Sequence, residues 1–117
     1  MGIQAQFTFM GTSGSMGIPV IGCHCATCNS LNPLDKRMRP SGLIQVADKN
    51  FIIDVGPDFR MQALRLGIEK IDGVLISHAH SDHIAGLDDL RAYYFLHKSK
   101  TPCLLSELTF EELKQRY

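Results

Sequence analysis

One short segment, Ser77 to His83, constrains this chain more than any other part of its sequence. It reads Ser-His-Ala-His-Ser-Asp-His and directly follows the apolar run Gly73 to Ile76. A short, continuous apolar run is typical of a strand that is buried on both faces. In open α/β sheets, functional side chains usually gather at the carboxyl ends of such strands. The chain is therefore expected to fold around a sheet that presents these histidines at one end.

Four side chains of this segment are potential metal ligands, namely His78, His80, Asp82 and His83. The first three are spaced by two, so in extended backbone they point to one side. Imidazole and carboxylate together suit Zn, Mn or Fe. Two such ions about 3.5–4 Å apart would polarise a substrate oxygen and hold a hydroxide between them. A simpler interpretation, a polar loop with incidental histidines, stays open.

Length and charge limit the classes of protein to which the chain can belong. Its 117 residues, 44% of them hydrophobic, suffice for one modest core. The 12 basic and 12 acidic residues balance, which argues against a nucleic-acid or membrane-surface binder that works by bulk charge. No apolar run approaches the length of a membrane span, and the start lacks the pattern of a secretory signal. We therefore expect a cytoplasmic protein that does not bind membranes, with nucleic acid an improbable partner.

A second cluster of metal-binding residue types precedes the first. Cys23, Cys25 and Cys28 lie within six positions, with His24 between the first two. In a cytosolic chain, clustered cysteines indicate metal or redox chemistry before disulfides. Structural zinc takes four nitrogen or sulfur ligands, of which this motif supplies three. Buried or reactive thiols without a metal are the alternative.

The remaining pattern predicts an α/β architecture with a mixed sheet. Residues 18–42 are expected to be irregular, because Pro19, Pro33 and Pro40 interrupt them. Asp48-Lys49-Asn50 is expected to form a hairpin turn, Asp58 to cap a helix that ends at Gly67, and Thr109 to cap the last helix. The expected strands cover residues 4–10, 43–46, 51–55, 73–76 and 102–105, and the expected helices 58–66, 84–97 and 109–116.

The segment SHAHSDHIAGL resembles the His-x-His-x-Asp-His signature of the metallo-β-lactamase-fold hydrolases. Ile52-Ile53-Asp54-Val55-Gly56 is similar to the strand-end Asp-x-Gly that precedes this signature in that superfamily. Upstream, FMGTSGSMGIPVIGCHCATC and KRMRPSGLI resemble one branch, which holds the phosphonate-pathway cyclic phosphodiesterases and a protein of pyrroloquinoline-quinone biosynthesis. The resemblance extends from about Phe7 to Tyr117 and implies the N-terminal half of an αββα sandwich, a mixed β-sheet with flanking helices.

The resemblance also implies residue roles at the His/Asp cluster. His78 and His80 would bind the first of two divalent ions, Zn or Mn, and Asp82 and His83 would bind the second and act as catalytic residues. Asp54 would orient the cluster; a turn residue before the following Gly-Pro is its simpler interpretation.

Two further sites follow from the same resemblance. The three cysteines would hold a structural zinc whose last ligand comes from far downstream; Cys103 or His97 would have to fold back to supply it. Arg37 and Arg39 belong to the only basic run, which is either a solvated face or a site for an anionic substrate, because guanidinium pairs well with phosphate. The glycine-rich loop of residues 11–17 is either a tight turn or a phosphate cradle.

The implied function is hydrolysis of a cyclic or nucleotide phosphodiester by a metal-bound hydroxide. A tRNA-processing nuclease, a thioester hydrolase and a catalytically inactive metal-binding or interaction module are the alternatives. After His83 the chain offers none of the ligands that the second half of such a fold supplies. We therefore expect residues 1–117 to form a single partial domain, completed either by a missing C-terminal half or by a second copy in a homodimer.

Overall fold

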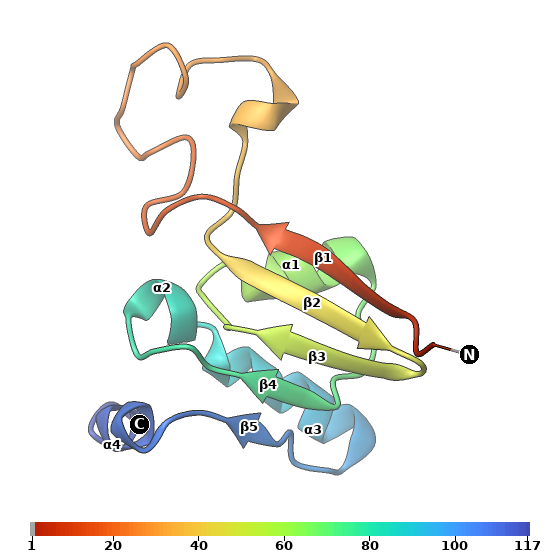
Figure 1. The fold of residues 1–117 in the computed structure, drawn as a ribbon. Helices are drawn as coiled ribbons and strands as arrows, with labels where there is room; N and C mark the ends of the chain where they lie inside the picture. Colours follow the sequence, from red (N-terminus) through yellow and green to blue (C-terminus); the bar gives the residue numbers. More distant parts are fainter. Residues whose placement is uncertain (1) are drawn as a thin grey trace.

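The computed structural model describes residues 2–117 and centres on a single five-stranded sheet (Figure 1). The strands lie in the order of the sequence; the first three are antiparallel, and β3, β4 and β5 are parallel. Their bounds are Ala5–Gly11 for β1, Ser41–Val46 for β2, Lys49–Ile53 for β3, Gly73–Leu75 for β4 and Cys103–Leu104 for β5. The predicted mixed α/β sheet is confirmed.

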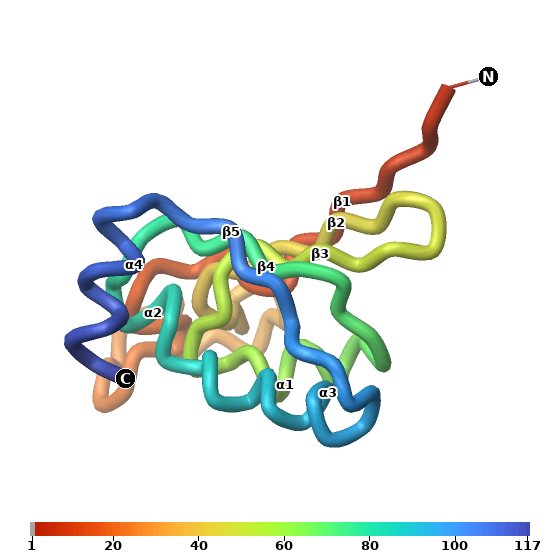
Figure 2. The backbone as a smooth tube through the Cα atoms, turned by 90° about the horizontal axis from the view of Figure 1, so that it is seen from below, coloured from red at the N-terminus to blue at the C-terminus, as the bar shows by residue number. Residues whose placement is uncertain are grey.

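One face of the sheet carries the hydrophobic core. Leu43, Ile52 and Val74 are paired side by side across β2, β3 and β4, and all three are buried. Helices α1 (Phe59–Leu66) and α3 (Arg91–His97) lie on the same side of the sheet (Figure 2). The buried ring of Phe59 belongs to this core. The sheet is therefore covered by helices on one face.

The other face of the sheet is also apolar. Phe7, Ile44 and Phe51 are paired in one row across β1, β2 and β3. Phe9 and Leu104, on the two edge strands, are 73% and 70% exposed. A face of this composition is typical of a surface that packs against another layer. This arrangement agrees with the half-sandwich that the sequence predicts.

The predicted helix over residues 84–97 is wrong in its extent. The structure divides that segment into α2 (Ser81–Ile84), the 3-10 helix η2 (Leu87–Leu90) and α3. The break falls at Gly86, whose N–H donates to Val55 O at 2.9 Å instead of continuing the helix. A Cβ on Gly86 would lie 2.1 Å from Gly56 O, so the backbones meet where no side chain fits.

Two local predictions shift by a few residues. Lys49 and Asn50 belong to β3, so the hairpin turn is the pair Ala47-Asp48, with Ala47 at a φ of 53°. Two-residue hairpins favour such positive φ values. The last helix, α4 (Glu107–Lys114), is capped by Ser106 and not by Thr109, because Ser106 Oγ accepts the Thr109 N–H at 3.2 Å.

Other boundaries agree with the sequence. Helix α1 ends at Gly67, which has a φ of 63° and donates its N–H to helix carbonyls. Residues 12–40 form an irregular excursion between β1 and β2 that extends away from the end of the sheet (Figure 1) and holds only the short 3-10 helix η1 (Pro33–Asp35) among its helices. Within the described range 2–117, no helix has the length and apolar character required to cross a bilayer.

Candidate metal centre

The His/Asp cluster lies beyond the carboxyl ends of two neighbouring parallel strands. Ser77 to His80 form the loop between β4 and α2, and Asp54 directly follows β3. The Asp54 N–H donates to Leu75 O at 2.8 Å, and the Val55 N–H donates to His83 O at 2.9 Å. These backbone bonds extend the pairing of β3 and β4 past the strands. They fix the two segments against each other at the predicted end of the sheet.

Asp54 is the buried anchor of the cluster, with 5% of its surface exposed. Its carboxylate accepts the Ser77 N–H at 2.7 Å and the Ser77 hydroxyl at 2.6 Å. It also lies 2.7 Å from His83 Nδ1. Asp54 has a φ of 60°, a left-handed conformation that Asp tolerates better than most residues do. The carboxylate therefore occupies the position that an orienting residue requires, while its role stays a prediction.

The hydrogen bonds also determine which histidine nitrogens are free. A carboxylate only accepts, so His83 Nδ1 donates to Asp54; in the neutral ring, Nε2 is then the nitrogen that can bind a metal. The Ser77 hydroxyl donates its only proton to Asp54 and therefore accepts from His78 Nδ1 at 2.9 Å. A ligating histidine generally has its second nitrogen held in this manner. The chemistry of this donor set fits divalent metal ions.

The structure brings the three imidazole rings together. The ring centroid of His78 lies 4.5 Å from that of His80 and 4.0 Å from that of His83. The Asp82 carboxylate lies 3.2 Å from His83 Nε2. His78 thus lies against both other rings, and Asp82 lies beside His83, which Asp54 holds. The sequence argument missed Ser77, which links Asp54 to His78; its place directly after the buried strand was the available signal.

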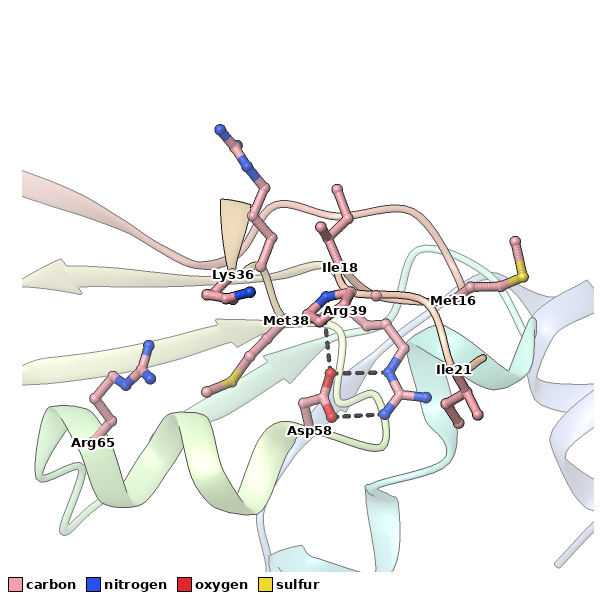
Figure 3. Close-up of a pocket in the computed structure, with 11 residues that line it drawn as sticks. Met16, Ile18, Ile21, Lys36, Met38, Arg39, Asp58 and Arg65 are labelled. Carbon is pink, nitrogen blue, oxygen red and sulfur yellow. Dashed lines mark hydrogen bonds and ion pairs between the residues drawn. The ribbon is translucent and has the colours of Figure 1, made fainter. Parts of the chain in front are cut away.

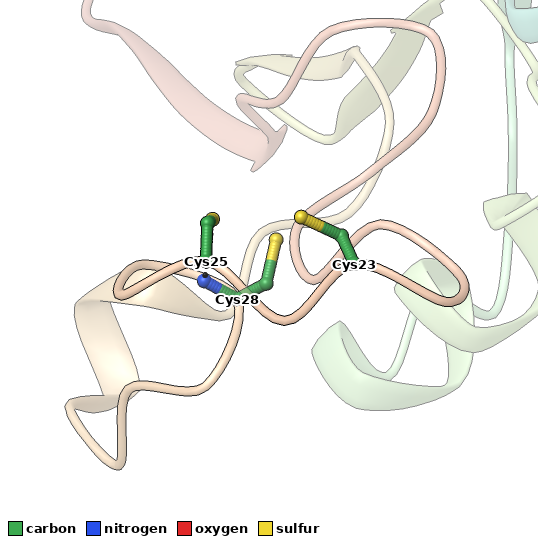
Figure 4. Close-up of side chains that lie close together, drawn as sticks. All are labelled: Cys23, Cys25 and Cys28. Carbon is green, nitrogen blue, oxygen red and sulfur yellow. Dashed lines mark hydrogen bonds between the residues drawn. The ribbon is translucent and has the colours of Figure 1, made fainter.

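The three cysteines lie in the excursion between β1 and β2 (Figure 4). Their sulfur atoms are all within 4.8 Å of one another, and no other group of ligands among residues 2–117 converges as closely. The Cys28 N–H donates to Cys25 Sγ at 3.4 Å and, together with the Cys23 thiol, lowers the pKa of Cys25 to about 7. Readily formed thiolates favour zinc. The trio therefore fits a structural zinc with three of four ligands.

The suggested fourth ligands lie elsewhere in the fold. Cys103 belongs to β5 and pairs with Val74. His97 ends α3, and its Nε2 donates to Glu69 O at 2.8 Å. Neither residue joins the cysteine group within the described chain.

The basic run borders a hollow of about 300 Å³ (Figure 3). Arg39 donates to Asp58 through Nε at 2.9 Å and Nη2 at 2.7 Å, and the Arg39 N–H adds a third bond. This pairing lowers the pKa of the Asp58 carboxyl and raises that of Arg39. Asp58 stands at the start of α1 as predicted, but its side chain binds Arg39 and does not cap the helix.

Arg37 and the glycine-rich loop form hydrogen bonds with other residues of the same excursion. Arg37 donates to Leu34 O at 2.9 Å and to Thr12 Oγ1 at 3.1 Å. In the loop, the Ser13 N–H bonds to Met38 O, and the Gly17 N–H closes a turn onto Gly14 O. These bonds favour the tight-turn interpretation of the loop. Substrate binding by Arg37 and Arg39 stays a prediction.

Comparison with solved structures shows which known folds this chain resembles. A diphosphatase of the PhnP family aligns with 97% of this chain and 46% of its own, with a TM-score of 0.93 and 44% identity. Zinc-bound PqqB from Methylobacterium extorquens aligns with 88% of this chain and 46% of its own, with a TM-score of 0.63 and 17% identity, which is a likeness of fold. The expected resemblance to the PhnP family is confirmed, whereas the comparison with PqqB shows the shared fold alone.

Two sequence relatives have different names. An octanoyltransferase of Porphyromonas gingivalis is 52% identical over 83 residues, which are 70% of this chain but 17% of that protein. A ribonuclease Z of Bradyrhizobium diazoefficiens is 33% identical over 85 residues, covering 71% of this chain and 23% of that enzyme. The chain thus spans less than half the length of these relatives and of the two solved structures. Residues 49–117 match the family described as the beta-lactamase superfamily domain. The chain belongs to this family of metallo-β-lactamase-fold proteins.

Proposed function

We propose that this chain provides the His/Asp half of a metal-dependent hydrolase that cleaves a phosphodiester or diphosphate bond in a small, nucleotide-like substrate. The observation that carries the proposal is the likeness to the PhnP-family diphosphatase, at 44% identity over 97% of this chain. At this identity the likeness includes the fold around the His/Asp cluster, which the sequence singles out independently.

The chain's own residues prepare the centre for metal binding. His78 and His80 are proposed to bind one ion, and Asp82 and His83 a second. Two divalent ions, Zn or Mn, would supply Lewis-acid charge and an activated water to the reaction. Asp54 holds His83 directly and His78 through the Ser77 hydroxyl, so the Nε2 lone pairs are oriented before any ion binds. Such orientation reduces the cost of ordering ligands.

The identity of the substrate is the finer part of the proposal. A ribonuclease Z activity is less favoured, because the similar ribonuclease Z is 33% identical over 71% of this chain, whereas the PhnP-family diphosphatase is 44% identical over 97% of it. The name octanoyltransferase describes a protein of which the similar segment forms 17%. Phosphoryl chemistry therefore has the stronger support.

Native mass spectrometry before and after chelation, followed by an assay with bis-p-nitrophenyl phosphate, tests the proposal. The chain is expected to carry ions that chelation removes and to hydrolyse this phosphodiester when manganese or zinc is added. His80→Ala should reduce turnover about 100-fold or more. His97→Ala is the matched control, because His97 lies on α3 and binds only Glu69 O.

Three outcomes separate the alternatives. Metal-dependent turnover that His80→Ala leaves unchanged would refute the proposed role of the cluster. Metal binding without turnover by a homodimer would favour the non-catalytic metal-binding module. The mass itself reports whether two copies complete each other in a homodimer; for a monomer, the assay belongs on a longer chain that includes the second half.

A further inference from the structure

The hollow beside Arg39 is positively charged, although the chain as a whole is neutral. Four cationic side chains and one carboxylate line it, in a chain whose formal net charge is zero. The four cations are Lys36, Arg37, Arg39 and Arg65, and the carboxylate is Asp58. Even with Arg39 paired to Asp58, three positive charges surround a volume of about 300 Å³. Such a concentration favours an anionic ligand.

Several donors on these cations are uncommitted. Arg39 uses Nε and Nη2 for Asp58, so the ion pair holds the guanidinium rigidly and leaves Nη1 available. Lys36 Nζ has one bond, to Ser30 O at 2.7 Å, and an ammonium group has three hydrogens. Arg65 makes no ion pair or side-chain hydrogen bond within residues 2–117. Figure 3 shows Arg65 rising from α1 toward the segment that carries Lys36 and Met38.

The opposite wall of the hollow is aliphatic. Met16 and Ile21 are 69% and 99% exposed and therefore accessible to a ligand. In Figure 3 they lie on the other side of the Arg39–Asp58 pair from Arg65. A ligand that satisfies both walls has an anionic end and an apolar or aromatic body.

The hollow also lies close to the His/Asp cluster. Asp58 is two residues from Gly56, so their Cα atoms are at most about 7.6 Å apart. A Cβ on Gly56 would lie 2.1 Å from Asp82 O, so Gly56 touches the loop that carries the proposed ligands. The Asp82 carboxylate contributes to raising the pKa of Arg39, which is consistent with this proximity.

From these observations we propose that the hollow is a binding subsite for an organic phosphate, in which Lys36 and Arg65 hold the phosphoryl group, the paired Arg39 lies between the two walls, and Met16 and Ile21 contact the organic body. The inference rests on the proposed function, because it assigns to this subsite the part of the substrate that lies beyond the scissile bond. It adds Lys36 and Arg65 to the residues that determine specificity. It also explains why Asp58 binds Arg39 instead of capping α1.

Isothermal titration of the chelated protein with adenosine 5′-monophosphate tests the subsite. This nucleotide is expected to bind about tenfold more tightly than adenosine or inorganic phosphate, because each of these lacks one half of the ligand. Arg65→Gln should weaken nucleotide binding about fivefold or more and leave adenosine binding unchanged. Arg60→Gln is the matched control: it makes the same charge change on the same helix, where Arg60 lies outside this hollow.

Several results would overturn the proposal. They are equal losses in Arg65→Gln and Arg60→Gln, equal affinities for the nucleotide and adenosine, or binding of inorganic phosphate as tight as that of the nucleotide. Binding of a short single-stranded RNA in the absence of nucleotide binding would instead identify a polynucleotide contact. Circular dichroism of both variants verifies that they fold. The titration uses the chelated protein and needs no bound metal. A failed turnover assay would therefore refute the proposed hydrolase without refuting nucleotide binding in the hollow.

Discussion

The two ligand clusters of this protein are built in opposite ways. The His/Asp cluster draws on two segments 23 residues or more apart, joined by Asp54 at the ends of β3 and β4. The cysteine trio comes from six consecutive positions in an excursion that leaves the sheet. Its internal hydrogen bond, from the Cys28 N–H to Cys25 Sγ, spans only three residues.

This difference shows which contacts hold each cluster in place. A cluster held by the sheet depends on strand pairing and on close backbone contacts far from the ligands in sequence. A cluster held by a turn depends on its own few residues and on whatever ion it binds. Changes in the sheet should therefore disturb the histidines and leave the cysteines intact.

The largest expected effect comes from Asp54→Ala. The substitution removes the acceptor of the Ser77 N–H, the Ser77 hydroxyl and the His83 ring, and should lower the free energy of unfolding by about 3 kcal/mol. Urea denaturation measures this loss. Asp88→Ala, at an exposed ion pair with Arg91, is the control and should change little. Equal losses in the two variants would contradict the anchoring role of Asp54.

Gly86→Ala should lower the free energy of unfolding by about 2 kcal/mol. The new Cβ would clash with Gly56 O and push α2 away from the strand ends. Gly14→Ala is the control, since a Cβ at Gly14 has no atom within 4 Å. Thermal unfolding compares the two. If the comparison between the clusters is right, Gly86→Ala impairs metal binding at the histidines and leaves zinc binding by the cysteines unchanged. An equal loss of metal binding at both clusters would contradict the comparison between them.

Acid should weaken the ion pair between Arg39 and Asp58. Arg39 lowers the pKa of Asp58, so the pair stabilises the fold above the ordinary Asp pKa of about 3.9, and this contribution is lost as the pH falls through the lowered value. Asp58→Asn should therefore lower the free energy of unfolding by about 1 kcal/mol near pH 7, and by progressively less below about pH 4. Urea denaturation across this range measures the difference. A constant difference down to pH 2 would exclude the linkage.

The smallest effect concerns thiol reactivity. The pKa of Cys25 is about 7, whereas burial raises the pKa of Cys103. Iodoacetamide at pH 7 should therefore modify Cys25 of the chelated protein about fivefold faster than Cys103. Peptide mass spectrometry measures both rates. Added zinc should protect Cys25 and leave Cys103 reactive; equal protection of Cys103 would mean that zinc bridges the trio to β5.

The sequence predicted the sheet class and the end of α1 at Gly67, because both rest on local pattern. It failed where a distant contact decided the outcome. The helix predicted over residues 84–97 breaks at Gly86, because that backbone bonds to Val55. Arg39, 19 positions away, took the carboxylate of Asp58 that was expected to cap α1. The cap at Ser106 in place of Thr109 is a local difference, because its hydrogen bond spans three residues.

The sequence by itself determined the residue types of both clusters and the spacing within each. It also determined the cysteine geometry, since a turn of six residues has few ways to arrange its thiols. Only the tertiary structure decided that Asp54 reaches His83, that Ser77 completes the link to His78, and that Arg65 faces the basic run. The contacts of Asp54 with Ser77 and His83 join residues 23 and 29 positions apart, and strand pairing, which no local pattern encodes, brings such residues together.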